Sequence, residues 1–140
     1  PAGQTRDCVF GYTILNDVSA RDVQTAHKQW YFGKSLDGFT PIGPCIVTAD
    51  AFADYPPRLG IRSFVDGETR QDSNTALQLF AIDHVFAELS QGMTLKAGTI
   101  IATGTPAGVG MGMDPPQFLK PGDVVRCEIE GIGTLTNPVK

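Results

Sequence analysis

The sequence predicts an α+β domain in which strands outnumber helices. Segments rich in apolar and β-branched residues, typical of strands, are spread from residue 8 to residue 138, whereas only two segments carry the signals of helices. The 16 glycines and 10 prolines indicate many turns between these elements. Because 140 residues with 41% hydrophobic content suffice for one core, residues 1–140 are predicted to form a single domain.

The N-terminal part should contain one strand, one helix and a loop. Residues 8–15 are mostly apolar and predict a buried strand. A helix follows, with Ser19 as its predicted N-cap and Asp22 in the position of a capping-box acid, and it should run to about Trp30. Residues 33–45 carry the glycines and prolines of a loop, and residues 45–48 predict a short strand.

The C-terminal part should contain a hairpin, a second helix and three further strands. Asp66-Gly67, between residues 62–65 and 68–71, is a strong signal for a type I′ hairpin. Residues 74–91 have apolar residues at helical spacing, and Gly92 follows as a stop signal. Residues 99–103 predict a short strand that runs into a glycine-rich loop. Two more strands, at residues 123–129 and 133–138, should be joined through residues 130–132.

The composition argues against several classes of protein. The net charge is −4 and no cluster of Lys or Arg is present, so we expect no nucleic-acid partner. No apolar run approaches the roughly 20 residues of a membrane span, and no signal-peptide pattern opens the chain. Cys8, Cys45 and Cys127 fit neither a disulfide framework nor a zinc site, which favours a reduced, cytoplasmic setting. Because the chain starts at Pro1 without a Met, we expect a piece of a longer protein.

Residues 16–24 carry the side chains most typical of a binding site. Asp17 falls where the predicted strand meets the helix, and Arg21 and Gln24 share one helix face, with His27 a weaker candidate one turn further on. A helix N-terminus favours anionic ligands, and a hard cation such as Mg²⁺ favours carboxylate oxygens. On spacing alone the commoner interpretation is structural: Asp17 and Ser19 end the strand and cap the helix, and Arg21 is solvated.

Two glycine-containing segments allow both a binding and a structural interpretation. Gly33-Lys34-Ser35 is not a nucleotide-binding loop, because Lys28 stands where the first glycine of that loop is needed. Lys34 can bring a cation into a pocket, although without further context an ordinary surface lysine is preferred. Residues 103–110 have the wrong glycine spacing for a dinucleotide site. This loop can point backbone N–H groups and the Thr105 hydroxyl at a carboxylate, or it can be a flexible connection.

Two pairs of polar residues imitate catalytic sites but have simpler explanations. Glu128 and Glu130 share a strand face that would suit a metal, but Arg126 shares it too, so a solvated strand edge is expected. His84 and Glu88 are one helical turn apart and lie away from the apolar stripe, so an exposed pair is expected rather than an acid–base dyad.

Several segments, in order along the chain, resemble the signature blocks of the fumarylacetoacetate hydrolase family. They include NDVSARDVQ at residues 16–24, GKSLD at 33–37 and TGTPAGVG at 103–110, with further matches at 11–13, 41–44, 65–68 and 119–123. The combination covers essentially the whole chain and is specific to the family, though not to one substrate. The resemblance implies a mixed β-sandwich roll with a few short helices, usually in a homodimer, and a Mg²⁺ or Mn²⁺ site.

The resemblance also assigns roles to individual residues. Asp17 resembles the family's aspartate metal ligand, and Lys34 resembles the lysine beside the metal. Thr105 resembles the threonine of the carboxylate-binding loop. The residues expected to contact substrate are Arg21, Gln24, Gly104 and Thr105, and those expected to take part in catalysis are Lys34, Arg21 and Gln24.

The family resemblance implies an enzyme that acts on a small 2-keto or 1,3-diketo acid. We expect a hydrolase or lyase that cleaves a C–C bond, or a decarboxylase, working through a metal-stabilised enolate; an isomerase of a 2-hydroxy-diene-dioate is the alternative. The family's Glu-x-Glu metal ligands and its His–Glu lid pair have no counterpart, because Glu128-Ile129-Glu130 lies at the wrong end of the domain. We therefore expect the C-terminal two-thirds of the family's domain, and an inactive ligand-binding fragment is a second alternative.

Overall fold

The computed structural model describes residues 5–26 and 28–140 and contains two antiparallel sheets. One pairs β1 with β2, and the other has the strand order β4–β3–β5–β6. The strands are β1 (Gly11–Leu15), β2 (Ile42–Thr48), β3 (Gly60–Val65), β4 (Glu68–Asn74), β5 (Val124–Ile129) and β6 (Gly133–Pro138). The helices are α1 (Arg21–Ala26) and α2 (Ile82–Gly92), with short 3₁₀ turns such as η2 (Arg6–Cys8), η3 (Phe32–Lys34) and η5 (Thr75–Leu77). The predicted mostly-β architecture is confirmed.

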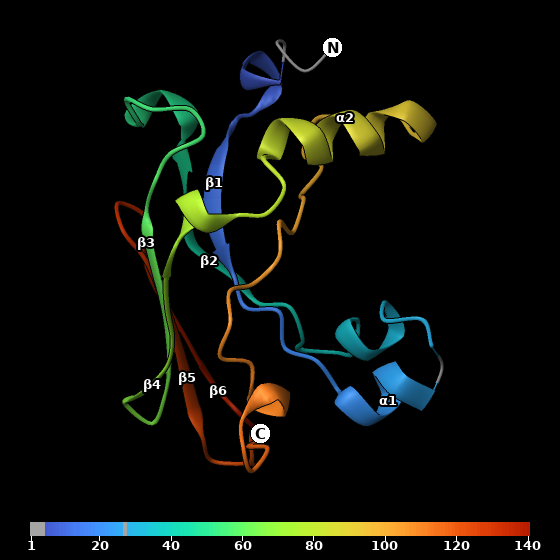
Figure 1. Ribbon diagram of the computed structural model, residues 1–140, viewed down its shortest axis with the longest axis vertical. Coiled ribbons are helices and arrows are strands. Elements are labelled where there is room, and N and C mark those ends of the chain that lie inside the picture. The colour runs from blue at the N-terminus through green and yellow to red at the C-terminus, as the bar shows by residue number, and fades with distance from the viewer. Residues whose placement is uncertain (1–4, 27) are drawn as a thin grey trace.

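The two helices lie on the same side of the strands but at opposite ends of the molecule (Figure 1). Helix α2 lies near the N-terminal end of β1, and α1 lies toward the end where the chain terminates. The segment that follows α2, coloured orange, runs between the two helices toward β5. This segment carries the glycine-rich loop, so the fold brings that loop into the space between the sheets and α1.

The β3–β4 hairpin has the predicted type I′ turn. Asp66 and Gly67 have φ angles of 51° and 84°, both in the left-handed region that this turn requires. Strand β3 pairs with β4 on one side and with β5 on the other, and β5 continues into β6. The two predicted C-terminal strands are therefore confirmed, and β5 is an interior strand of the sheet.

Strand β1 is shorter than predicted and β2 is longer. The first residues of the predicted 8–15 strand belong partly to η2, and pairing begins only at Gly11. A Cβ at Gly11 would lie 2.4 Å from the carbonyl oxygen of Val47, so the two strands approach closely there. The Thr13 hydroxyl donates to the carbonyl oxygen of Cys45 at 2.8 Å and adds a side-chain link between the strands.

Helix α1 is shorter than predicted at both ends. Lys28 has φ 55°, a left-handed conformation that cannot continue a right-handed helix, and the helix ends before it. The carbonyl of Ala20 accepts the first helical hydrogen bond, from the Gln24 N–H at 2.9 Å. Ala20 therefore occupies the N-cap position, and the prediction of Ser19 there was wrong.

Helix α2 begins at Ile82, well after the predicted start at residue 74. Asn74 ends β4, and its side-chain oxygen accepts a hydrogen bond from the Ala76 N–H at 2.9 Å, which turns the chain into η5. Asparagine side chains compete in this way with helical hydrogen bonding. Leu79, one of the apolar residues at helical spacing that predicted the longer helix, lies in the connection that follows and is 87% exposed. Gly92 is the last residue of the helix, close to its predicted role as a stop.

Residues 99–103 were predicted as a strand, but this described segment belongs to neither sheet. The Gln78 side-chain amide donates to the carbonyl of Thr103 at 3.1 Å. A β-branched run forms a strand only where a neighbouring strand offers it hydrogen-bonding partners, so its composition alone misled the prediction.

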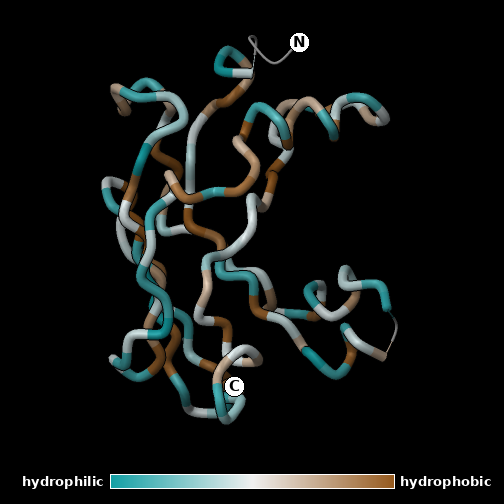
Figure 2. The backbone as a smooth tube through the Cα atoms, viewed as in Figure 1, coloured by the Kyte–Doolittle hydropathy of each residue, from teal (hydrophilic) through white to brown (hydrophobic). Residues whose placement is uncertain are grey.

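Hydrophobic residues lie along several strands and along the connections between them (Figure 2). Within the described residues, the most buried hydrophobic side chains are Ile14, Val125 and Ile132. The accessible surface is 9544 Å², compared with about 7,000 Å² for a compact monomer of this mass. Much apolar surface, including Phe10, Phe80 and Phe118, is therefore left open. No described helix has the length and apolar character needed to cross a bilayer.

Candidate functional site

Asp17 and Lys34 form an ion pair where β1 leads into α1. The Lys34 ammonium donates to Asp17 Oδ2, and both side chains keep contact with solvent, at 27% and 34% exposure. The two residues are 17 positions apart, so the pair depends on the turn η3 folding back against the start of α1. A carboxylate and a cation are thus held together at an accessible position.

Gly33 explains how η3 approaches α1 so closely. The Gly33 carbonyl accepts a hydrogen bond from the Ala20 N–H at 2.8 Å. A Cβ at Gly33 would lie 2.9 Å from the Ala20 carbonyl oxygen and from two atoms of Gln24, so only glycine fits without displacement. On the other side, the Thr40 hydroxyl donates to the Lys34 carbonyl at 2.8 Å. The backbone of Lys34 is therefore fixed from both directions.

Arg21 and Gln24 are joined by a short hydrogen bond on α1. Arg21 Nη1 donates to Gln24 Oε1 at 2.6 Å, and Gln24 is only 2% exposed. Gln24 therefore orients the guanidinium from a buried position, and its direct contact with substrate stays a prediction. The Ser19 hydroxyl donates to the carbonyl of Asp17 at 3.2 Å, so Ser19 fixes the backbone beside the acid.

Thr105 lies on the glycine-rich loop and is held by β4. The Gln71 side-chain amide donates to the Thr105 hydroxyl oxygen and to the carbonyl oxygen of Pro106, both at 2.8 Å. Thr105 itself is exposed, as is Gly104, whose φ is +100° and at which an added Cβ would have no neighbour within 4 Å. The loop is thus positioned rather than free, although its outer surface is open to a ligand.

The same loop packs backbone against backbone further along. Gly108 has φ +107°, and a Cβ there would lie 2.0 Å from the carbonyl oxygen of Arg70. A Cβ at Gly110 would lie 1.9 Å from the carbonyl oxygen of Gln117, whose side chain accepts a hydrogen bond from Arg70 Nη1. The interpretation of residues 103–110 as a flexible connection therefore does not describe this structure.

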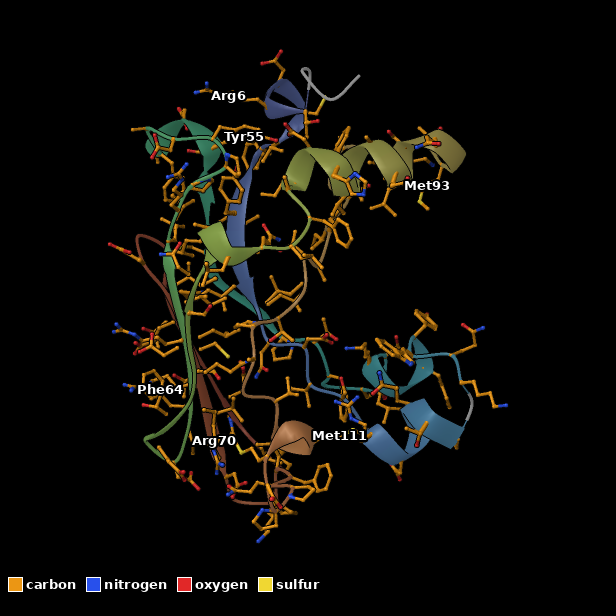
Figure 3. All side chains as sticks on the ribbon, in the orientation of Figure 1. Arg6, Tyr55, Phe64, Arg70, Met93 and Met111 are labelled. Carbon is orange, nitrogen blue, oxygen red and sulfur yellow. The ribbon has the colours of Figure 1, made fainter. Side chains whose placement is uncertain are left out.

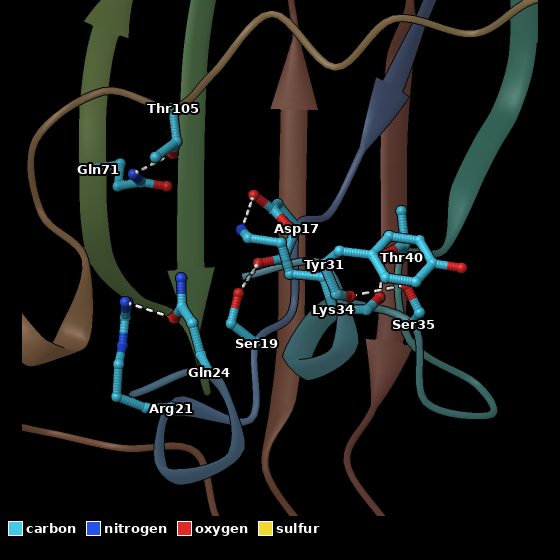
Figure 4. Close-up of polar contacts among 10 residues, drawn as sticks. All are labelled: Asp17, Ser19, Arg21, Gln24, Tyr31, Lys34, Ser35, Thr40, Gln71 and Thr105. Atoms are coloured by element: carbon cyan, nitrogen blue, oxygen red, sulfur yellow. Dashed lines mark hydrogen bonds and ion pairs between the residues drawn. The ribbon is translucent and has the colours of Figure 1, made fainter. Parts of the chain in front are cut away.

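Figure 4 shows three polar pairs, in which Asp17 points toward Lys34, Arg21 toward Gln24 and Gln71 toward Thr105. The region is an open surface. Two hollows among the described residues lie elsewhere, one of about 580 Å³ lined by residues such as Arg6 and Tyr55, the other of about 790 Å³ lined by residues such as Arg62 and Glu130.

The hollow beside Arg6 and Tyr55 lies at the opposite end of the molecule from Arg70 and Met111 (Figure 3). The Tyr55 hydroxyl donates to Asp83 Oδ1 at 2.7 Å. Burial, together with this hydrogen bond, raises the pKa of Tyr55 well above its ordinary value. This hydrogen bond joins α2 to the segment around Tyr55, away from the predicted site residues.

The described residues supply only part of a metal-binding site. Asp17 provides one hard oxygen ligand of the kind that Mg²⁺ and Mn²⁺ accept. Among residues 5–26 and 28–140, no group of three or more His, Cys, Asp or Glu side chains could hold a metal ion. Asp17 therefore fits an ion that takes its other ligands from water, substrate or groups beyond these residues.

The Glu128/Glu130 and His84/Glu88 pairs have structural contacts, and one prediction about Glu128 was wrong. Glu128 pairs with Arg126 at 3.4 Å, and Glu130 accepts a hydrogen bond from the Gly60 N–H at 3.0 Å. Because β5 lies between β3 and β6, Glu128 is on an interior strand, and the predicted strand edge was wrong. His84, exposed like Glu88, stacks on Phe80 with 5.1 Å between ring centroids. His27 lies outside the described residues.

Two supporting residues were missed from the sequence. Gly33 lies in a segment considered only for its lysine, and a close approach of two backbones leaves no local signal. Gln71 lies on a predicted hairpin strand, and its partner Thr105 comes 34 residues later. The role of Gln71 depends on the packing of the loop against β4, which a local sequence pattern does not reveal.

Comparisons with known proteins agree with this arrangement. The family model described as fumarylacetoacetate (FAA) hydrolase C-terminal matches residues 1–140. The chain is 50% identical over 133 residues to oxaloacetate tautomerase YisK of Bacillus subtilis, covering 95% of this chain and 44% of that protein. It is 50% identical over 135 residues to the mitochondrial oxaloacetate tautomerase fahd2 of Xenopus laevis, covering 95% of this chain and 42% of that protein.

Solved structures give the same result. A fumarylacetoacetate hydrolase from Exiguobacterium antarcticum superposes with a TM-score of 0.95 at 53% identity, covering 100% of this chain and 50% of that one. A 5-carboxymethyl-2-hydroxymuconate delta-isomerase from Mycobacterium smegmatis superposes with a TM-score of 0.86 at 46% identity, covering 99% of this chain and 51% of that one. The chain spans about half the length of the relatives it matches.

Proposed function

The chain belongs to the fumarylacetoacetate hydrolase family. We propose that it carries part of an active site that interconverts the keto and enol forms of a small 2-keto dicarboxylic acid, with oxaloacetate as the first candidate. The observation that carries the proposal is the accessible ion pair of Asp17 and Lys34. Two relatives named oxaloacetate tautomerases, at 50% identity, support this choice of substrate.

Tautomerisation breaks a C–H bond and forms an O–H bond at the neighbouring keto oxygen. It needs a base, here water, to take the carbon proton, and stabilisation of the negative charge that develops on the oxygen. In this proposal the Lys34 ammonium, which pairs with Asp17, also donates a hydrogen bond to that oxygen. Such preorganised donors account for large parts of enzymatic rate enhancements. Thr105 and the loop amides bind a carboxylate and so orient the substrate. Arg21, held by the buried Gln24, adds a second positive charge on the helix side.

A divalent ion, Mg²⁺ or Mn²⁺, is part of the proposal. Asp17 would hold it through a carboxylate oxygen, and the ion would supply Lewis-acid stabilisation of developing negative charge. The accessibility of Asp17 supports this role, because a fully buried ion pair would leave no room for an ion and its remaining ligands.

Cleavage of a C–C bond, by hydrolysis or decarboxylation, is the second candidate. The similarity to a solved protein named fumarylacetoacetate hydrolase, at 53% identity, favours it. Both candidates place negative charge on the same oxygen, so Lys34 and Asp17 would serve either. Formation of pyruvate and CO₂ from oxaloacetate distinguishes decarboxylation from tautomerisation, which changes only the ultraviolet absorbance of the enol.

The test is the effect of Asp17→Asn in the full-length protein, assayed with oxaloacetate and Mg²⁺ or Mn²⁺. This substitution keeps the size of the side chain but removes its charge, so we expect kcat/KM to fall by about 100-fold or more. Asp37→Asn, at an exposed acid a few residues beyond Lys34, is the matched control and should leave the rate unchanged. A metal-loaded Asp17→Asn protein with full activity would refute the proposal.

The inactive-fragment alternative has its own measurement. Titration of this 140-residue chain with Mn²⁺ and oxalate should raise its melting temperature if the Asp17 region binds a ligand without further segments. No shift would support an inert fragment and would leave the assay of the full-length protein as the test of the enzyme.

We also propose that the protein acts as a homodimer. The large exposed apolar surface supports its burial against another polypeptide surface. Light scattering of the full-length protein after size-exclusion chromatography should give the mass of two chains, and a monomer at micromolar concentration would refute this assembly.

A further inference from the structure

The side chain of Gln71 connects β3 to the Thr105 loop through three hydrogen bonds. The Ser63 hydroxyl donates to Gln71 Oε1 at 2.8 Å, and Ser63 and Gln71 face each other as register partners on β3 and β4. Gln71 Nε2 donates to the Thr105 hydroxyl oxygen and to the Pro106 carbonyl oxygen, each at 2.8 Å. Every polar atom of this amide is therefore engaged.

These contacts determine which way the amide faces. A carbonyl oxygen only accepts hydrogen bonds, so the Gln71 atom next to Pro106 must be the NH₂ group. The amide oxygen then faces Ser63, which must donate. Because the same NH₂ group reaches Thr105, the Thr105 oxygen accepts one hydrogen bond from the protein. Its own hydrogen is left to point away from Gln71, toward the open side of the loop.

A β-bulge in β4 makes this arrangement possible. In the β3–β4 pairing, Ser63 faces Gln71 but the next residue, Phe64, faces Thr69, so Arg70 is an extra residue in β4. Consecutive residues of a regular strand point to opposite faces of the sheet. Here both reach the glycine-rich loop and the residues after it, Gln71 at Thr105 and Arg70 at Gln117. The bulge therefore lets two consecutive residues of β4 hold this segment.

We propose that Gln71 is a positioning residue that presets the Thr105 hydroxyl as a hydrogen-bond donor, and that this makes the loop selective for a carboxylate over a group that presents an N–H at the same position. A carboxylate oxygen only accepts, so it matches a hydroxyl whose hydrogen already points outward. A carboxamide that presents its NH₂ group would find no acceptor there. This inference rests on the proposed function, in which Thr105 binds a substrate carboxylate.

The first experiment compares Gln71→Glu with the unsubstituted full-length protein, using oxaloacetate and Mg²⁺. Glutamate has the same shape but, when ionised, accepts the Thr105 hydrogen and removes it from the substrate. We expect KM to rise by about 10-fold to 100-fold, typical for loss of a hydrogen bond to a charged group, while kcat changes by less than about threefold. An unchanged KM, with or without a lower melting temperature, would overturn the inference.

The second experiment asks whether Gln71 acts through Thr105. Thr105→Val removes the hydroxyl, and Gln71→Leu removes the amide at similar size. If Gln71 works through Thr105, the double variant should have a KM within about twofold of Thr105→Val alone. Independent, multiplicative increases in KM would assign Gln71 a separate role and would overturn the inference. Ser63→Ala, which keeps the amide, should raise KM less than Gln71→Leu does.

Binding of malonate, a dicarboxylate that serves as an inert probe, distinguishes failure of the proposed reaction from failure of the proposed role of Gln71. If the unsubstituted protein does not convert oxaloacetate but binds malonate in calorimetry, the reaction was wrongly assigned, and weaker malonate binding by Gln71→Glu would still support the inference. If the unsubstituted protein neither reacts with oxaloacetate nor binds malonate, both proposals are refuted. Normal turnover with unaltered malonate binding in Gln71→Glu refutes only the role of Gln71.

Discussion

The two halves of the candidate site are built in different ways. The half around Asp17 and Lys34 is local, because its hydrogen bonds join residues 3 and 17 positions apart. The half around Thr105 is long-range, because its bonds to β4 join residues 34 and 35 positions apart. The local half depends on one short helix and one 3₁₀ turn, whereas the loop depends on the register of a sheet.

This difference has a consequence for stability. The local half is partly solvated, so its ion pair adds little to the free energy of folding. The loop packs its backbone onto the carbonyl of Arg70, so its position and the stability of β4 are linked. Substitutions in the loop should therefore affect folding and binding together, and substitutions of the Asp17–Lys34 pair should affect mainly binding and catalysis.

The largest effect is expected for Gly108→Ala. Its φ of +107° strains any other residue, and its Cβ would lie 2.0 Å from the Arg70 carbonyl oxygen. Strain and overpacking together should lower the free energy of unfolding by about 2–5 kcal/mol. Gly122→Ala is the matched control, because its φ is +100° but nothing lies within 4 Å of the added Cβ. Urea denaturation of both variants measures the difference, and equal losses would show that packing against Arg70 is unimportant.

A smaller effect is expected for Gly33→Ala in the local half. Its added Cβ would meet Ala20 and Gln24 at 2.9 Å, which should cost about 1–3 kcal/mol and shift Lys34 away from Asp17. We expect a loss of activity beyond what the lower free energy of unfolding explains, because this turn carries a proposed catalytic residue. In Gly92→Ala, at the end of α2, the added Cβ has no neighbour within 4 Å, and both quantities should stay near those of the unsubstituted protein. A fully active Gly33→Ala protein would contradict this account of the turn.

The smallest effect is expected for Glu68→Gln on β4. Glu68 pairs with Arg70 at 3.3 Å but its side chain is 68% exposed, so the change in stability should be below about 0.5 kcal/mol. Asp72→Asn, at a similarly exposed ion pair with Arg62, should behave alike. A much larger loss at Glu68 would mean that this charge, rather than backbone packing, holds Arg70 against the segment that follows the loop.

Elements that depend on near neighbours in the sequence were predicted more accurately than elements that depend on distant contacts. The hairpin at Asp66-Gly67 was predicted because a type I′ turn requires two residues that tolerate left-handed φ angles. The helix predicted over residues 74–91 was partly wrong, because Asn74 completes β4 before the chain can become helical. The strand predicted over residues 99–103 was wrong, because pairing depends on a neighbouring strand that a local pattern does not reveal.

Part of the local half of the candidate site could be anticipated from the sequence. Residues 16–24 contain a strand end, a helix start and their polar side chains within a few turns, so spacing alone places Arg21 beside Gln24. The pairing of Asp17 with Lys34 agrees with the family resemblance, while their roles in metal binding and catalysis stay predictions. The hydrolase or lyase expected from the resemblance is the second candidate for the reaction, since relatives named tautomerase, hydrolase and isomerase are all similar to this chain.

By itself, the sequence determined the mostly-β class, the hairpin, the family and the residues around Asp17, because each depends on interactions between near neighbours or on motifs of fixed spacing. Only the tertiary structure decided that Gln71 fixes Thr105, that Gly33 brings Lys34 to Asp17, and that a bulge at Arg70 supports the glycine-rich loop. These contacts depend on how closely distant backbones approach, and that distance is set by packing of the whole chain rather than by any segment of it.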